Sequence, residues 1–194
     1  LVRCRNLNID RTLATGSVKD INGKDIEITI VTRDYAYELF AQMAAQQHIP
    51  FKYPEDGCYA RAHEMSRLLD GEGIVTGKTF IEGDLRVETE NSPKGYVEWW
   101  YHVAPIIKVK GENGGDDQVY VLDPSIFQRP VPVEEWFRIQ TAHQGGRQDE
   151  VYQTRRFNYT PNDKSRDMKK YSSSDIESMQ DTMRQYMEQQ RERE

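Results

Sequence analysis

The sequence predicts an α+β fold in which an antiparallel sheet packs against helices. Apolar and polar residues alternate over residues 26–30 and 96–109, which is typical of strands with one buried face. In residues 34–50 and 58–70 apolar residues instead recur every three or four positions, as in amphipathic helices. The glycine-rich stretch 111–117 separates two strand-like segments and predicts a hairpin, so these two strands are expected to be antiparallel.

The composition is that of one globular domain. The chain has 194 residues, of which 37% are hydrophobic, enough to form a single core. Its formal net charge of −6 provides no basic field that would attract nucleic acid or anionic lipid. No apolar run approaches the roughly 20 residues needed to span a bilayer. We therefore expect no nucleic-acid partner, no membrane span and a monomer.

Residues 1–24 are expected to precede the main domain, residues 25–194. They are polar, do not begin with methionine and show no sustained periodicity. We interpret them as a leader, a prosegment remnant or an extension. After the strand at 26–30, a helix is expected to start near Asp34, to end before Pro50, and to bury one face formed by Tyr37, Phe40, Ala41 and Ala44.

A second helix is expected over residues 58–70, with Cys58 in its first turn and glycines behind it. Trp136 and Phe137 indicate a short helix packed on the core, and residues 143–174 carry no clear pattern. Further strands are expected at 78–81, 96–109 and 118–122.

The last helix is expected at about 174–190 and has an apolar stripe. This stripe is either docked on the chain's own domain or free to bind a partner. Its residues are Ile176, Met179, Met183 and Met187.

Cys58 is the first candidate for a chemical role. The unpaired N–H groups and the dipole at a helix start stabilise a thiolate, which is the nucleophilic form of cysteine. The alternative is a small buried cysteine with a packing role. The chain has only two cysteines, Cys4 and Cys58, so a working thiol at one position leaves no pair for a structural disulfide.

His102 is the best candidate for a base among the four histidines. It lies in an aromatic strand, where a buried imidazole needs a partner. His63 is on the Cys58 helix but five residues further, about 140° around the helix axis, and so points elsewhere. His48 is interpreted as structural at a helix end and His143 as a loop residue.

Asp123 ends a strand and is followed by Pro124, so its carboxylate is expected at the edge of the sheet, beside the His102 strand. There it could hydrogen-bond one imidazole nitrogen and leave the other for the thiol. The alternative is an ordinary Asp-Pro turn. A metal site formed by the same three residue types is not favoured, because the sequence has no CxxC, HxxxH or HExxH pattern.

Three motifs resemble bacterial protein-glutaminase, also called protein deamidase, a family of transglutaminase-like cysteine hydrolases. They are FKYPEDGCYARAHEM from Phe51, WWYHVA from Trp99 and LDPSIF from Leu122, and the similarity extends from about residue 29 to residue 128. The resemblance implies a fold with a transglutaminase- or papain-like core. It also implies hydrolysis of glutamine side chains in proteins or peptides to glutamate and ammonia, through a thioester and with no cofactor or metal.

The resemblance assigns Cys58 as nucleophile, His102 as acid and base, and Asp123 as the third member of a triad in the catalytic domain, residues 25–194. Substrate-binding residues are expected next to these three. Trp100 is favoured over Trp99, because strand alternation places it on the same side as His102. The full expected set is Tyr59, Trp99, Trp100, Tyr101 and Ser125.

Two further functions use the same residues. Acyl transfer to an amine, as in transglutaminases, would consume the same thioester. A secreted effector or toxin module would deamidate or simply bind one host protein through the methionine-lined last helix. Secretion, or delivery as a bacterial effector, is the expected localisation, and the absence of a spare cysteine pair fits an oxidising or a reducing compartment equally well.

Overall fold

The computed structural model describes residues 8–194, in which four α-helices and a seven-stranded sheet form the fold. The elements, in chain order, are β1 (Ala14–Lys19), β2 (Asp25–Val31), α1 (Arg33–Ala44), α2 (Cys58–Asp70), β3 (Gly77–Glu88), β4 (Tyr96–Val109), β5 (Gln118–Val121), β6 (Val131–Pro132), α3 (Val133–Thr141), β7 (Arg147–Arg155), the 3-10 turn η1 (Pro161–Asp163) and α4 (Ser173–Arg191).

The long strands β3 and β4 form the centre of the sheet. The main strand order is β1-β2-β4-β3-β7, with β5 paired to β4 and β6 to β5. All of these pairings are antiparallel except β2 with β4, which is parallel. The predicted α+β class with an antiparallel sheet is thus confirmed, with one parallel contact added. The expected hairpin around 111–117 joins β4 to β5.

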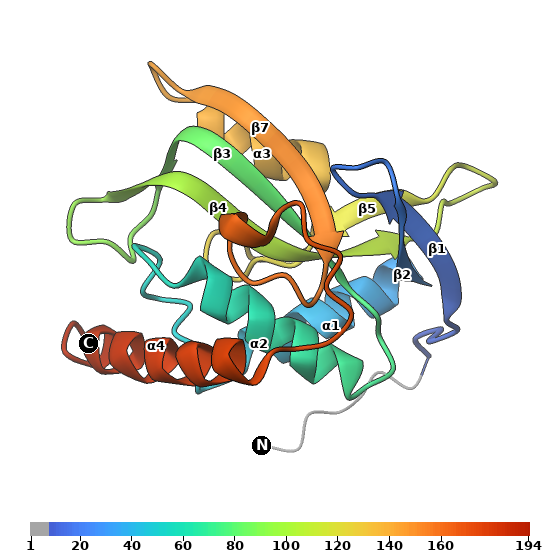
Figure 1. Ribbon diagram of the computed structural model, residues 1–194, viewed down its shortest axis with the longest axis horizontal. Coiled ribbons are helices and arrows are strands. Elements are labelled where there is room, and N and C mark those ends of the chain that lie inside the picture. Colours follow the sequence, from blue (N-terminus) through green and yellow to red (C-terminus); the bar gives the residue numbers. More distant parts are fainter. Residues whose placement is uncertain (1–7) are drawn as a thin grey trace.

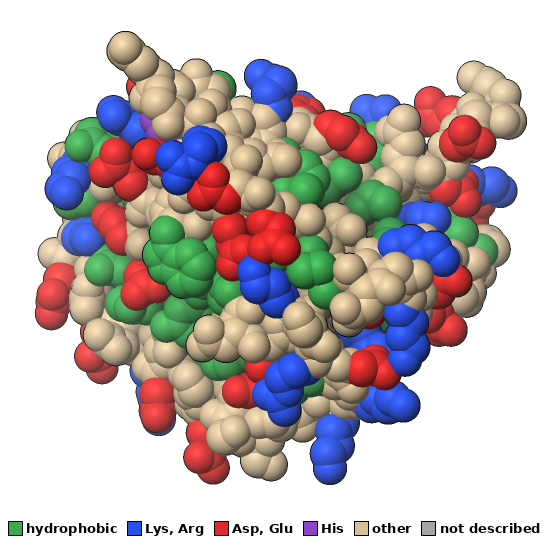
Figure 2. All heavy atoms as spheres, turned by 45° about the horizontal axis from the view of Figure 1, so that its top comes forward, with side chains coloured by type: hydrophobic (Ala, Val, Ile, Leu, Met, Phe, Trp, Pro, Cys, Tyr) green, Lys and Arg blue, Asp and Glu red, His purple; other side chains and the backbone are tan. Residues whose placement is uncertain are grey.

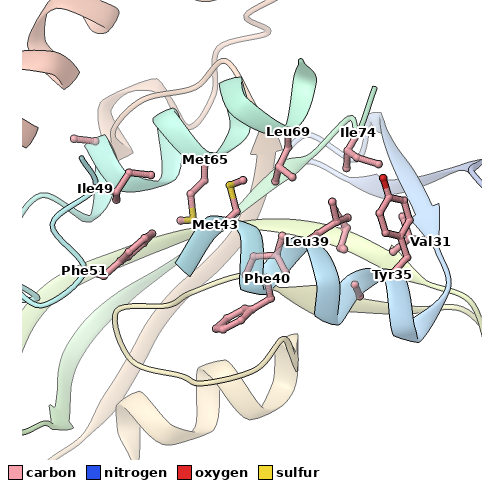
Figure 3. Packing of buried hydrophobic residues seen from close by; sticks show 14 of the residues in the cluster. Val31, Tyr35, Leu39, Phe40, Met43, Ile49, Phe51, Met65, Leu69 and Ile74 are labelled. Carbon is pink, nitrogen blue, oxygen red and sulfur yellow. The ribbon is translucent and has the colours of Figure 1, made fainter. Parts of the chain in front are cut away.

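Helices α1, α2 and α4 lie on one side of the sheet, and α3 lies on the other side, behind β7 (Figure 1). The first layer is an apolar cluster in which Leu39 and Met43 of α1 meet Met65 and Leu69 of α2 (Figure 3). The second layer joins α3 to the sheet, where Trp136 packs among aliphatic side chains of the strands. The central strand β4 therefore carries side chains into both layers, Ile107 into the first and Ile106 into the second.

Two strands occupy stretches where the sequence pattern predicted none. β1 pairs with β2 through a tight turn, so residues 14–24 belong to a hairpin of the sheet. β7 forms the opposite edge, inside the stretch that had no clear pattern. Both are edge strands with mostly exposed or half-buried residues, which weakens the hydrophobic alternation that reveals a strand. The first seven residues of the expected leader, including Cys4, lie outside the described residues.

The helix predictions differ from the structure mainly in detail. α1 ends at Ala44, and its buried face is shifted by about one position from the expected one, because Tyr35, Ala36, Leu39, Phe40 and Met43 point inward. α4 spans Ser173–Arg191, close to the expected 174–190. The three methionines of its stripe, Met179, Met183 and Met187, are buried against the chain's own domain.

The described surface carries charges of both signs. On the face drawn in Figure 2, acidic and basic side chains are interspersed, with small hydrophobic areas between them. Among residues 8–194, no helix combines the length and the apolar character needed to cross a membrane.

Candidate active site

Cys58 is the first residue of α2, as the sequence predicts. The helix has no side-chain cap, and Gly57 precedes it in a left-handed conformation with φ of 79°. The thiol is buried and packs against Phe80, Val103 and Tyr152. Because the first N–H groups of a helix have no partner within the helix, this buried thiol lies beside unpaired backbone donors.

His102 lies on β4 and is fixed by Asp123. Its Nε2 atom is 2.8 Å from Oδ2 of Asp123, and both side chains are buried. The other ring nitrogen, Nδ1, is buried and has no hydrogen-bond partner within the described residues. One nitrogen is thus occupied by the carboxylate, and the other is left for the thiol of Cys58.

The charges of this pair stabilise each other. Burial alone would lower the pKa of His102, but the carboxylate of Asp123 and the neighbouring Cys58 outweigh it and raise that pKa to about 9. Burial alone would raise the pKa of Asp123, but His102 and further donors lower it to about 2. At neutral pH the carboxylate is therefore ionised and accepts a hydrogen bond from Nε2–H.

Three more donors hold the carboxylate of Asp123. The backbone N–H of Ser125 lies 3.2 Å from Oδ1, and its hydroxyl lies 2.5 Å from the same oxygen. The indole Nε1–H of Trp136 donates to Oδ2 at 2.9 Å. Ser125, expected to bind substrate, is buried and bonded to Asp123 instead.

Trp136 belongs to the site but was expected only to pack the core. Besides its bond to Asp123, its ring lies nearly parallel to that of His102, with centroids 5.4 Å apart. It comes from α3, on the far side of the sheet, so neither strand alternation nor proximity in sequence could connect it with His102. A buried indole that needs a hydrogen-bond partner was the available signal.

The two neighbouring tryptophans of β4 lie differently from the prediction, because Trp99 and not Trp100 packs on His102. Trp99 stacks on His102 at a centroid distance of 4.3 Å, and its Nε1–H donates to the carbonyl oxygen of Pro54 at 3.0 Å. Trp100 is 63% exposed. The pairing of β3 with β4 shifts register between Glu82 and Leu85, and such a bulge changes the direction of side chains, so simple alternation fails here.

The two tyrosines of the expected substrate-binding set lie close to Cys58. Tyr101 is half-buried, and burial together with the neighbouring Cys58 raises the pKa of its hydroxyl. It therefore remains a protonated donor beside the sulfur. The ring of Tyr59 makes an edge contact with Tyr159 at 5.3 Å and so turns toward the α4 side of the site.

The remaining histidines have other partners. His63 accepts a hydrogen bond from the buried Lys78, with 2.8 Å between Nδ1 and Nζ, which explains why it does not face Cys58. His48 pairs with Glu64 at 2.8 Å, and His143 lies 3.4 Å from Asp84. Within the described part of the chain, no three His, Cys, Asp or Glu side chains gather as metal ligands would.

Comparison with known proteins identifies the family. The sequence profile of the glutaminase family matches residues 36–140, which is more than half of the chain and includes Cys58, His102 and Asp123. The chain belongs to the glutaminase family. Among curated proteins, none is significantly similar to this chain in sequence.

Solved structures of protein-glutaminase are similar to this chain. The crystal structure of pro-protein-glutaminase has 25% sequence identity and a TM-score of 0.67 over 79% of this chain and 57% of its own. The crystal structure of protein-glutaminase has 23% identity and a TM-score of 0.65 over 90% of each chain, which shows the shared fold. The NMR structure of protein-glutaminase from Chryseobacterium proteolyticum has 26% identity and a TM-score of 0.64 over 77% and 85%.

Proposed function

We propose that this glutaminase hydrolyses the side-chain amide of glutamine in proteins or peptides, with Cys58, His102 and Asp123 as its triad. The observation that supports this most directly is that the two ring nitrogens of His102 have different surroundings. Nε2 is bonded to a buried, ionised carboxylate, whereas Nδ1 is unpaired near a thiol at a helix start. Membership of the glutaminase family and similarity to protein-glutaminase structures support the same substrate class.

In the first half of the reaction, Cys58 attacks the carboxamide carbon of glutamine. An imidazolium next to a cysteine favours the thiolate, and His102 with a pKa of about 9 is protonated at neutral pH. Backbone N–H groups at the start of α2 stabilise the oxyanion that forms. His102 then gives its Nδ1 proton to the departing nitrogen, and ammonia leaves a thioester on Cys58.

In the second half, water hydrolyses the thioester. His102, now neutral, removes a proton from the water through Nδ1 while Asp123 stabilises the imidazolium that returns. The products are glutamate, which releases a proton to solvent, and the Cys58 thiolate beside the imidazolium. Both proton transfers that His102 makes pass through its Nδ1 atom, and water is the second reactant.

Ammonia release from a glutamine peptide tests the proposal. The purified chain is incubated with a peptide that contains one internal glutamine, and ammonia and product mass are measured. We expect glutamate in place of glutamine with wild type and no measurable product with Cys58→Ala. Wild type without ammonia release, or Cys58→Ala with the same rate as wild type, would contradict the proposal.

The same assay separates hydrolysis from acyl transfer. Adding a primary amine offers the thioester a second acceptor in competition with water. Glutamate as the main product in its presence supports the proposed hydrolase. A predominant amine adduct would instead identify a transglutaminase.

A further inference from the structure

Helix α4 holds the segment of chain that leads into Cys58. It lies outside the residues matched by the family profile and runs alongside α2 (Figure 1). Its methionines face the core, but its C-terminal half contacts residues 52–57, more than 120 positions earlier in the sequence. These contacts are separate from the imidazole and carboxylate of the site.

The central contact is made by Tyr186. Its hydroxyl donates to Oδ2 of Asp56 at 2.6 Å. The other carboxylate oxygen of Asp56, Oδ1, accepts the backbone N–H of Gly57, also at 2.6 Å. Tyr186 is thereby linked through one carboxylate to the Asp56–Gly57 peptide group, which directly precedes the Gly57–Cys58 peptide. Burial and Asp56 raise the pKa of Tyr186, so its hydroxyl remains a donor throughout the neutral range.

The ring of Tyr186 restricts the same segment by contact. It stacks on Tyr53, with centroids 4.8 Å apart and an angle of 13° between the rings. At Gly57, a Cβ atom would lie only 2.8 Å from the Tyr186 ring, and the φ of 79° also favours glycine. Glycine at this position therefore allows both the left-handed turn and the close approach of Tyr186.

Further bonds fix the segment from both sides. Arg61, buried on α2, donates to the carbonyl oxygens of Tyr53 at 3.0 Å and Asp56 at 2.6 Å. From the end of α4, Gln190 accepts the backbone N–H of Lys52 at 3.0 Å. The segment is thus held between α2 and α4, and Tyr186 contacts its last two residues, Asp56 and Gly57.

We infer that Tyr186 is a positioning residue for Cys58, acting through Asp56 and Gly57 on the peptide that starts α2. The direction of the Gly57–Cys58 peptide sets where the Cys58 N–H and the thiol point. A donor for the oxyanion and a nucleophile both depend strongly on such placement. The inference rests on the proposed function only where activity is the readout.

The test compares Tyr186→Phe with a matched control at the other end of α2. Tyr171 also donates to an aspartate, Oδ2 of Asp70, at 3.0 Å, and Asp70 ends α2 far from Cys58. Both variants lose one Tyr–Asp hydrogen bond and keep the ring. For Tyr186→Phe we expect kcat on a glutamine peptide to fall about tenfold with KM nearly unchanged, whereas Tyr171→Phe retains wild-type kcat.

A second readout does not depend on catalysis. Alkylation of Cys58 by iodoacetamide, followed by peptide mass analysis over a pH series, reports the nucleophile's surroundings directly. We expect several-fold slower alkylation at neutral pH in Tyr186→Phe and no change in Tyr171→Phe, at similar melting temperatures. This comparison decides the inference even if the wild type releases no ammonia, a result that would contradict the proposed function alone.

Asp56→Asn completes a double-mutant cycle. If Tyr186 acts through Asp56, the double variant with Tyr186→Phe loses no more activity than the larger single loss. Additive losses would overturn the proposed route. Equal kcat and alkylation rates in Tyr186→Phe and wild type, or equal losses in Tyr186→Phe and Tyr171→Phe, would overturn the inference itself.

Discussion

His102 and His63 are both buried, and each has a ring nitrogen 2.8 Å from a buried ionisable side chain. Their electrostatic surroundings are opposite. Asp123 raises the pKa of His102 to about 9 against the effect of burial. Around His63, burial and the cations Lys78 and Arg67 all act in one direction and lower its pKa to about 2. One imidazole is held charged and the other neutral within the same small domain.

The pKa values of the two histidines differ because their partners differ, since both side chains are buried. His63 serves as a neutral acceptor for the ammonium group of Lys78, a fully buried side chain that also donates to the carbonyl oxygen of Asn158 at 2.6 Å. Burial lowers the pKa of Lys78 itself to about 7. A buried histidine thus becomes suited to acid and base work only where an anion orients it, as Asp123 does for His102.

The strongest test of this contrast replaces each histidine by glutamine. His102→Gln removes the group that makes both proton transfers in the proposed reaction, so we expect kcat for ammonia release to fall at least about a thousandfold. His63→Gln keeps a polar acceptor far from the thiol, so we expect kcat per folded molecule to stay within about twofold of wild type.

Although His63→Gln is expected to keep its activity, it should lower the stability of the fold. Weakening the acceptor for the buried Lys78 ammonium should cost roughly 1–3 kcal/mol of unfolding free energy in His63→Gln, measured by urea denaturation. A large loss of kcat in well-folded His63→Gln would show that the contrast between the two histidines is wrong.

The next test concerns how the carboxylate is held, and compares the two indoles beside His102. Trp136→Phe keeps an aromatic ring but removes the 2.9 Å bond to Asp123, and we expect kcat to fall about tenfold. Trp99→Phe also keeps a ring, but the bond it removes goes to a backbone carbonyl, so its loss of kcat should be smaller. Equal losses would indicate that ring packing alone matters.

The three residues of the proposed triad could be singled out from the sequence because their signals are local. Cys58 follows a glycine at the start of a clear helix, and Asp123 follows a strand joined by a hairpin to the strand of His102. Trp136 could not be placed in the site, since α3 approaches from the other layer and its sequence distance to His102 carries no information. The bonds of Ser125 to Asp123 were not predicted either, because Ser125 was considered only as a substrate-binding residue.

The fold shows the same limit. Helices and central strands have strong periodicity and were predicted, whereas the edge strands β1 and β7 have weak alternation and were not. The placement of Trp99 on His102 was not predicted, and it occurs opposite a register shift of β3, near Gly83, that has no hydrophobic signature. There, a Cβ atom would lie 1.9 Å from the carbonyl oxygen of Arg147, so glycine marks the irregularity only in hindsight.

The contrast between the two histidines also predicts a difference in the pH dependence of stability. The folded pKa of His102 is raised above 6.5, so its contribution is complete below pH 6.5 and is lost as pH rises through about 9. The folded pKa of His63 is lowered, so its contribution is present above pH 6.5 and is lost as pH falls toward 2. The two histidines thus stabilise the fold on opposite sides of pH 6.5.

Urea unfolding of wild type and both glutamine variants, from about pH 5 to pH 9.5, measures this difference. Between pH 6.5 and 9 the advantage of wild type over His102→Gln should shrink by about 3 kcal/mol. The advantage over His63→Gln should shrink only on the acid side. Because Lys78 is present in wild type and in His102→Gln, its own titration cancels from the first comparison.

The indoles of Trp99 and Trp136 next to His102 also bear on where ammonia and water bind in the proposed reaction. Trp99 and Trp136 stack on the ring and Nε2 is bonded to Asp123, so three contacts hold the imidazole in one orientation. In the proposed reaction, the nitrogen that releases ammonia is therefore the nitrogen that later receives the water. The water molecule must occupy the place beside Nδ1 that ammonia has just left, so ammonia must depart before water can bind.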